Sequence, residues 1–172
     1  MDPSSELVDV VDTEDRFIRV AKRSEVRSEN LLHRGVFIAV RSSDNRLLIH
    51  QRSARKDVWP NYWDVAVGGV VASGESYEVA AERELDEEVG ISGDLEFLGA
   101  GIFENAEVRV IGHCYQVIHD GPFQFNDGEV VAADLVGPDQ LAETMKSAQM
   151  VPDSVALLLP LLSSPWNGLP RP

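Results

Sequence analysis

The sequence predicts an α/β fold in which a mixed β-sheet is covered by a few helices. The chain has 172 residues, of which 44% are apolar and 26% charged, and these proportions are typical of one folded domain with its own core. Most apolar runs are short and bounded by turn residues, as in strands. Segments with the start and stop signals of helices separate them, and this alternation indicates a sheet covered by helices.

The predicted strands begin with an N-terminal β-hairpin, formed by residues 7–11 and 17–20 around the acidic turn 12–15. Residues 24–30 are polar and are either a short helix or a linker. Further strands are expected at residues 34–41, 46–51, 64–71, 95–103, 108–118 and 129–136, with a loop at residues 53–62.

The clearest predicted helix covers residues 76–89, which contain neither Pro nor Gly and end at Gly90. Two more helices are expected, at residues 138–147 and at 154–162, each at or just after a proline. The apolar side chains of the last helix need cover, either from their own domain or from a second copy in a homodimer. We therefore expect a single domain, residues 1–172. It comprises a hairpin and linker (1–32), a core (33–147) and a C-terminal helix with a tail (148–172).

The net charge of −14 and its distribution limit the function. An acidic chain is not expected to bind nucleic acid, because phosphate contacts need basic surface. No apolar run is long enough to cross a membrane, the first residues are acidic, and Cys114 is the single cysteine, so a cytoplasmic protein is expected. Eleven of the fifteen Lys and Arg residues lie between residues 16 and 56, and seven acids with one base lie between 69 and 91. The first segment could attract an anion and the second a metal ion.

The acids of the predicted helix 76–89 form a candidate metal site. Glu84, Glu87 and Glu88 lie at i, i+3 and i+4, along one edge of an apolar stripe formed by Ala81, Leu85 and Val89. We expect them to be half-buried and to repel one another, because the helix contains no Lys and Arg83 is expected to project from the other side. A divalent cation such as Mg²⁺ would relieve this repulsion through oxygen ligands.

The residues before this helix are consistent with such a site. Gly68 and Gly69 lack side chains, so a backbone carbonyl could approach a metal ion closely. Glu75 precedes the helix and could reach Arg83 two turns along, which would fix the loop to the helix. A favourable charge at the helix N-terminus is the alternative role for Glu75.

The spacing of these residues resembles the Nudix box at each of its fixed positions. The order is Gly69, five residues, Glu75, seven residues, Arg83-Glu84, an apolar residue, any residue, Glu87-Glu88, any residue, Gly90 and an apolar residue. The wider resemblance covers residues 33–136. It implies a Nudix-type α/β/α sandwich with a mixed sheet. It also implies hydrolysis of a diphosphate linked to another group X, with Mg²⁺ or Mn²⁺ as cofactor.

The resemblance also implies roles for individual residues. Glu84, Glu87 and Glu88 would be catalytic metal ligands, one of them also the general base, and the Gly68 carbonyl would complete their set. Glu75 and Arg83 would be the supporting pair. An acid from outside the box is expected as a further ligand, with Glu129 as the first candidate and Glu104 as the second. The partner is a small-molecule diphosphate of the nucleoside diphosphate-X type, for which the candidate binding residues are Arg34 and Arg52, with Arg55 and Lys56 beside them.

Two alternatives to hydrolysis remain open. Residues 33–36, 51–53 and 59–64 resemble the branch that includes isopentenyl diphosphate isomerase. The resemblance to that family requires a Cys and a nearby His before the box, and residues 65–70 contain neither. The second alternative is a non-catalytic Nudix-fold ligand sensor, but such proteins usually lose box acids that this chain retains. Hydrolysis is therefore the favoured function.

Overall fold

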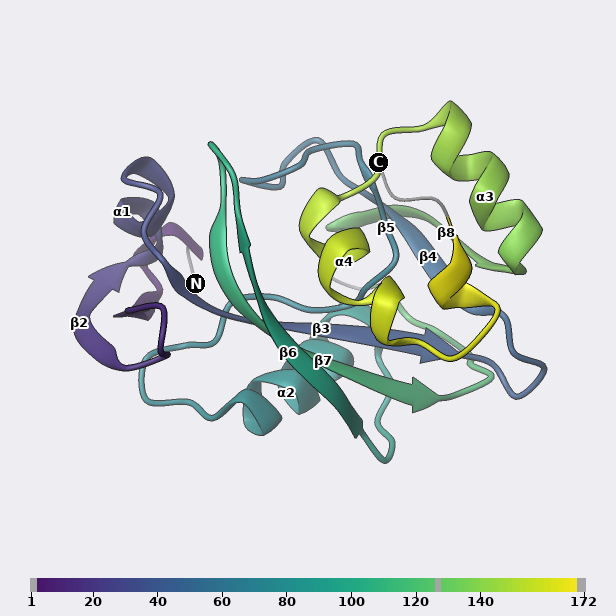
Figure 1. Ribbon diagram of the computed structural model, residues 1–172, viewed down its shortest axis with the longest axis horizontal. Coiled ribbons are helices and arrows are strands. Elements are labelled where there is room, and N and C mark those ends of the chain that lie inside the picture. The colour runs from purple at the N-terminus through teal and green to yellow at the C-terminus, as the bar shows by residue number, and fades with distance from the viewer. Residues whose placement is uncertain (1–2, 126–127, 170–172) are drawn as a thin grey trace.

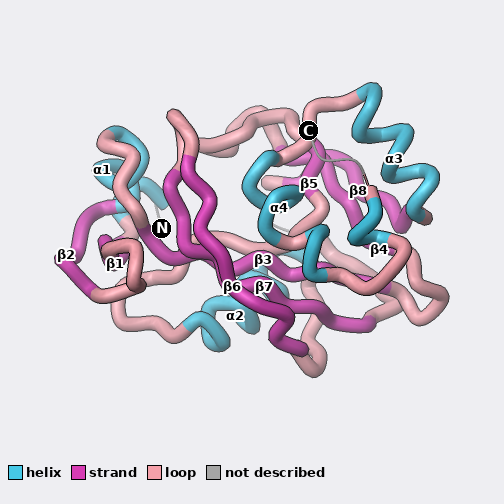
Figure 2. Tube along the Cα trace, in the orientation of Figure 1, coloured by secondary structure: helices cyan, strands magenta, loops and turns pink. Residues whose placement is uncertain are grey.

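The computed structural model describes residues 3–125 and 128–169 and has the expected α/β architecture (Figures 1 and 2). Its strands are β1 (Leu7–Val11), β2 (Phe17–Lys22), β3 (His33–Arg41), β4 (Leu47–Arg52), β5 (Trp63–Asp64), β6 (Glu96–Glu104), β7 (Arg109–Ile118) and β8 (Val130–Val136). The helices are α1 (Arg23–Ser28), α2 (Tyr77–Val89), α3 (Pro138–Ser147) and α4 (Pro152–Leu157). Short 3₁₀ turns occur at η1 (Pro3–Ser5), η2 (Leu159–Leu161) and η3 (Trp166–Gly168).

The sheet is mixed because one central strand pair is parallel and the others are antiparallel. β3 and β7 run parallel in continuous register from His33↔Val110 to Arg41↔Ile118. The antiparallel pairs are β1–β2, β1–β3, β3–β4, β4–β5, β4–β8 and β6–β7. Figure 2 shows the β1–β2 hairpin at the same end of the molecule as α1. The mixed sheet and the N-terminal hairpin predicted from the sequence are both confirmed.

Strand β3 divides the interior into two cores, because successive side chains of a strand point to opposite faces. Val36, Ile38 and Val40 contribute to the core beneath α2, whereas Phe37 and Ala39 pack with the core beneath the C-terminal segment. Figure 1 shows α2 on one side of β3 and β7, and α3 and α4 on the other. The sheet is therefore covered on both faces, as the predicted sandwich requires.

Two predicted elements differ from the structure. The expected strand at residues 64–71 is reduced to β5, and Val67 and Val70 are held by isolated bridges to Ile38 and Gly35. The regular strand is interrupted near Gly68, which has a φ of 155°. The expected helix at residues 154–162 begins earlier, at Pro152, and continues after Leu157 only as a 3₁₀ turn that contains Pro160. Proline lacks the N–H that a longer helix would require at that position.

The C-terminal segment packs on its own domain. Leu158, Leu162 and Trp166 are buried in the same core as Leu47 and Val155. This packing accounts for the apolar side chains without a second copy of the chain. Residues 170–172 of the predicted tail lie outside the described residues. Within the part of the chain that the structure describes, no helix has the length and apolar character that crossing a membrane would require.

We predict that Leu158→Ala lowers the free energy of unfolding by about 2–5 kcal/mol, because it leaves a cavity in this core. Leu161→Ala is the matched control, since Leu158 is 0% exposed and Leu161 is 38% exposed. The control should lose about 1 kcal/mol or less. Urea denaturation of both variants measures the difference, and equal losses would contradict a structural role for the C-terminal segment.

Candidate active site

Helix α2 carries the acidic residues and is fixed at both ends by its sequence. The Ser76 hydroxyl accepts a hydrogen bond from the Val79 amide at 3.3 Å, which caps the N-terminus. Gly90 ends the helix with a φ of 67°, a left-handed conformation that glycine adopts without strain. Its apolar side chains, Ala80, Ala81, Leu85 and Val89, are buried against the sheet. This packing sets the rotation of the helix and brings Glu84 and Glu88 to the edge of the core.

The three acids of the box differ in exposure. The side chains of Glu84 and Glu88 are 13% and 5% exposed, whereas that of Glu87 is 58% exposed. The expectation of three half-buried acids was therefore wrong for Glu87, which lies nearer to solvent. Burial, and then the charge of Glu88, raise the pKa of the Glu84 carboxyl to about 7.

Glycine at position 69 allows Glu84 to approach the preceding loop. A Cβ atom on Gly69 would lie 2.5 Å from Oε1 of Glu84. Gly68 is also restricted, since a Cβ atom there would lie 2.0 Å from the carbonyl oxygen of Val36. The Gly68 amide donates a hydrogen bond to Oε2 of Glu88 at 3.2 Å. The predicted use of the Gly68 carbonyl as a metal ligand stays a prediction.

Arg83 lies among the carboxylates, which corrects the expectation that it projects from the other side of the helix. Its Nη1 is 2.6 Å from Glu84 and 3.1 Å from Glu87. Its Nε and Nη2 donate to the two carboxylate oxygens of Glu75, both at 2.9 Å, and Nη2 also donates to the Val70 carbonyl at 3.1 Å. Arg83 therefore joins the helix to the loop that precedes it, and Glu75 and Arg83 are in contact as the spacing predicted.

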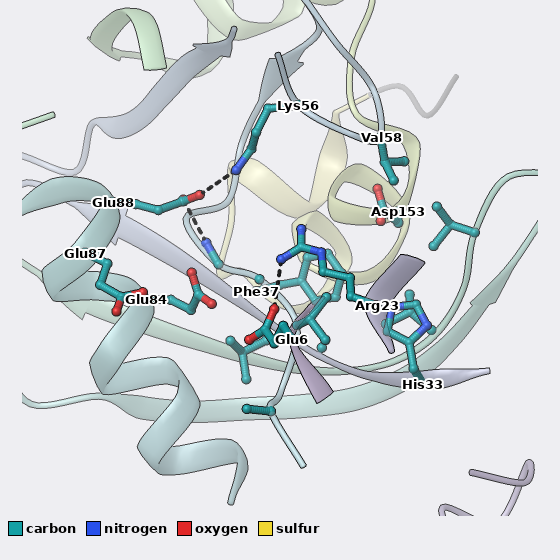
Figure 3. Close-up of a pocket in the computed structure, with 18 of the residues that line it drawn as sticks. Glu6, Arg23, His33, Phe37, Lys56, Val58, Glu84, Glu87, Glu88 and Asp153 are labelled. Atoms are coloured by element: carbon teal, nitrogen blue, oxygen red, sulfur yellow. Dashed lines mark hydrogen bonds and ion pairs between the residues drawn. The ribbon is translucent and has the colours of Figure 1, made fainter. Parts of the chain in front are cut away.

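Lys56 provides a second positive charge, although the acids were expected to lack cationic partners. Its ammonium group contacts Glu88 at 3.2 Å (Figure 3). It also contacts Glu129. Burial would lower the pKa of Lys56, but the charge of Glu88 and the hydrogen bond to Glu129 leave it above its ordinary value. Glu129 is thus beside the box acids, as its choice as the outside acid requires. Glu104, the second candidate, pairs with Arg109 and does not line the cavity beside these acids.

These residues line one wall of a cavity of 1170 Å³. Arg52 also lines it, where its Nη1 is 3.4 Å from Asp64. Arg34 does not line it: its guanidinium pairs with Asp9 and Asp15, away from the cavity. Of the two residues predicted to bind the substrate, the structure therefore brings only Arg52 to the cavity.

The opposite wall contains residues that the sequence analysis missed. Arg23 and Arg27 come from α1, and Asp153 from the first turn of α4. Arg23 pairs with Glu6 and Asp57. The concentration of basic residues before position 56 was visible in the sequence. Nothing in it indicated which of them the fold directs into the cavity.

The donor atoms of the site decide whether it could hold a divalent cation. Among residues 3–125 and 128–169, no three His, Cys, Asp or Glu side chains converge in an arrangement that would hold an ion directly. Lys56 instead contacts Glu88 and Glu129, and Arg83 contacts Glu84 and Glu87. The four glutamates offer carboxylate oxygens, the ligand type that Mg²⁺ and Mn²⁺ prefer. The donor set therefore fits such an ion. In the protein alone, Lys56 and Arg83 supply the positive charge that the ion would supply.

A mixed sheet between two helical layers, with a carboxylate-lined cavity beside the covering helix, defines the class of protein. A family model described as "NUDIX domain" matches residues 31–155, and the chain belongs to the Nudix family. It is 34% identical over 155 residues to an uncharacterized Nudix hydrolase of Pseudomonas aeruginosa, covering 90% of this chain and 92% of the relative. An uncharacterized Nudix hydrolase of Streptomyces coelicolor is 33% identical over 175 residues, covering 100% and 96%.

A solved structure supports the same classification. The crystal structure of DR0079 from Deinococcus radiodurans aligns with a TM-score of 0.73 and 27% identity, over 87% of this chain and 95% of that chain. With the hydrolases named among the relatives, the similarity makes this chain an enzyme of the Nudix pyrophosphohydrolase class.

We predict that Arg83→Gln lowers the free energy of unfolding by about 2 kcal/mol, because Glu84 would remain buried without its partner. Arg46→Gln is the control, since Arg46 pairs with Asp44 at an exposed turn. That control should change stability by about 0.5 kcal/mol or less. Chemical denaturation measures both, and a similar small loss in the two variants would argue against the central position of Arg83.

Proposed function

We propose that the protein hydrolyses a diphosphate bond in a substrate of the nucleoside diphosphate-X type, by attack of water on phosphorus and with Mg²⁺ or Mn²⁺ as cofactor. The observation that carries this proposal is the acidic wall of the cavity. On this wall, half-buried Glu84 and buried Glu88 lie near Glu129 and the cationic side chain of Lys56. A diphosphate could be held there only with additional positive charge, which a divalent ion provides.

Glu84, Glu87, Glu88 and Glu129 would hold the ion, together with the Gly68 carbonyl. When bound, the ion neutralises charge on the diphosphate oxygens and lowers the pKa of water. One of the helix carboxylates accepts the proton of the attacking water. The Glu75–Arg83 contact keeps the helix and its preceding loop in fixed relation during the reaction.

Two cationic side chains would bind the phosphate oxygens of the substrate. Arg52 and Lys56 line the cavity on the side of the β4–β5 loop, within reach of the acidic wall. An Arg guanidinium suits bidentate contact with phosphate, and a Lys ammonium acts as a compact charge. Arg34 has no part in this proposal because Asp9 and Asp15 hold it elsewhere.

The two alternatives are less well supported. An isomerase would need a thiol at the cavity, but Cys114 is 0% exposed in the core beneath the C-terminal segment and does not line the cavity. Burial also raises its pKa to about 12. A ligand sensor would not need a complete set of box acids. Hydrolysis uses all of these residues, and the assay below distinguishes it from binding alone.

We predict that Glu88→Gln lowers metal-dependent release of phosphate or nucleotide by at least about 100-fold while the protein stays folded, because a metal ligand or base is lost. The panel of substrates should include nucleoside di- and triphosphates, nucleotide sugars, dinucleoside polyphosphates and isopentenyl diphosphate. Glu82→Gln is the matched control, since Glu82 is an exposed acid on the same helix. Release that is equal in Glu88→Gln and Glu82→Gln would refute the assigned roles. No release by the wild type from any compound would favour a sensor.

We also predict that Mg²⁺ raises the melting temperature of the wild type. At ten times its dissociation constant, an ion that binds only the folded state adds about 1.4 kcal/mol, or about 3–6 °C for a chain of this size. Glu88→Gln should abolish most of this shift and Glu82→Gln should retain it. Differential scanning calorimetry with Mg²⁺ and Mn²⁺ measures it. Identical melting curves with and without these ions would contradict a site for the free ion.

A further inference from the structure

The wall of the cavity opposite α2 has its own polar chemistry. Figure 3 shows Asp153 and Arg23 on one side of the cavity and Glu84, Glu87 and Glu88 on the other. The elements that form this wall are α1, α4 and the loop after β4. A ligand with its diphosphate at the acidic wall would extend its organic group toward these elements.

Asp153 is the distinctive residue of this wall. It is 8% exposed and lines the cavity. Its Oδ1 atom is buried and has no hydrogen-bond partner among the residues that the structure describes. Leaving a buried acceptor unpaired is costly, and native proteins rarely do so without a functional reason.

The charged groups around Asp153 do not satisfy it. Arg27 of α1 is engaged with Asp57, and Arg52 of β4 with Asp64. Burial, and then the charge of Asp64, raise the pKa of Asp153 to about 6, so ionisation of this carboxyl at neutral pH costs the folded protein stability. The two nearby guanidinium groups thus leave this carboxylate available to a ligand.

Unpaired donors lie in the same cavity lining. Seven buried side-chain N or O atoms lack a hydrogen-bond partner within the described part of the chain, and three of them belong to cavity residues. Besides Asp153 Oδ1, these are Nε of Arg52 and Nε1 of Trp59. Arg52 is assigned to the phosphates, so one acceptor and one donor without partners remain for the organic group. They indicate a polar group in place of an alkyl chain.

We propose that this wall recognises the organic group of the substrate, and that the Asp153 carboxylate accepts a hydrogen bond from a hydroxyl or amino group of it. The inference rests on the proposed function and assigns the residue that recognises the organic group of the substrate. The substrate carries an uncharged, hydrogen-bond-donating group such as a sugar or a nucleobase. An isoprenoid diphosphate, whose organic end has no donor, leaves Asp153 unpaired and is disfavoured.

A structural role at the start of α4 is the competing explanation, and the chain contains a matched control for it. Asp153 follows Pro152 in the first turn of α4, and Asp139 follows Pro138 in the first turn of α3. Both acids can interact favourably with a helix N-terminus. Asp139 is exposed and lies outside the cavity lining. Substituting each residue separates the helix effect from recognition.

Binding of non-hydrolysable probes tests the proposal independently of catalysis. Calorimetric titration in Mg²⁺ compares α,β-methylene-ADP and α,β-methylene-ADP-ribose, which carry donors, with methylenediphosphonate, which has no organic group. We expect Asp153→Leu to weaken binding of at least one donor-bearing probe by about 10- to 100-fold, the loss of one hydrogen bond to a charged group. Methylenediphosphonate binding should be unchanged, and Asp139→Leu should leave binding of all three probes unchanged.

Asp153→Asn gives a second variant that preserves the shape of the side chain. It should weaken binding of the same probe by a smaller factor, because a neutral acceptor remains, and it should not lower the melting temperature at pH 7.5. A role only in stabilising α4 predicts a lower melting temperature and unchanged affinities.

Three outcomes would overturn the proposal. They are equal losses for the donor-bearing and donor-free probes, unchanged affinities in both Asp153 variants, and a wild type that binds methylenediphosphonate as tightly as the other probes. None of these outcomes depends on turnover. A hydrolase that shows them would refute only the recognition by Asp153. A protein without hydrolytic activity that binds as expected would refute only the proposed reaction.

Discussion

The neutralisation of buried carboxylates on α2 is the constraint on which the site depends. Glu84 and Glu88 are brought to the core edge by the apolar packing of their helix, where water screens them poorly. The chain compensates with Arg83 from the same helix and Lys56 from the β4–β5 loop. This arrangement explains the glycine at position 69, since a side chain there would collide with Glu84. The ion pairs of Arg83 and Lys56 thereby hold α2, the loop before it and the β4–β5 loop in a fixed relative position.

The same compensation makes the site suitable for a reaction of diphosphates. In the protein alone, cationic side chains neutralise the charge of the acids. Such a side chain can exchange its contacts when a metal cation and an anionic substrate bind together. Arg83 has further contacts with Glu75 and the Val70 carbonyl, so it stays fixed as a support. Both cations line the cavity, but within the described part of the chain the Lys56 ammonium group contacts the carboxylates of Glu88 and Glu129 alone. Lys56 is therefore the cation whose contacts can shift to a substrate. The two cations thus have different parts in the proposed mechanism.

The cavity is completed by segments far from the acidic helix in sequence. Arg23 and Arg27 come from a short helix that follows the N-terminal hairpin, and Asp153 from the start of α4. These segments lie near opposite ends of the sequence, but both line the wall of the cavity that faces the acids. In the mechanism proposed here the central helix carries the reaction, and the peripheral segments select the group attached to the diphosphate. Such a division lets one catalytic arrangement serve different substrates.

The sequence by itself determined the α/β class, the C-terminal end of α2 and the acids at its edge, because helix periodicity and a terminal glycine are local properties. It also predicted that Glu75 could reach Arg83, although Glu75 precedes the helix and the conformation of the loop completes the contact. Only the tertiary structure decided that Lys56 meets Glu88, that Arg34 turns away and that Asp153 faces the cavity. Each of these contacts joins residues distant in sequence, and their directions follow from how strands and loops pack, which no local pattern encodes.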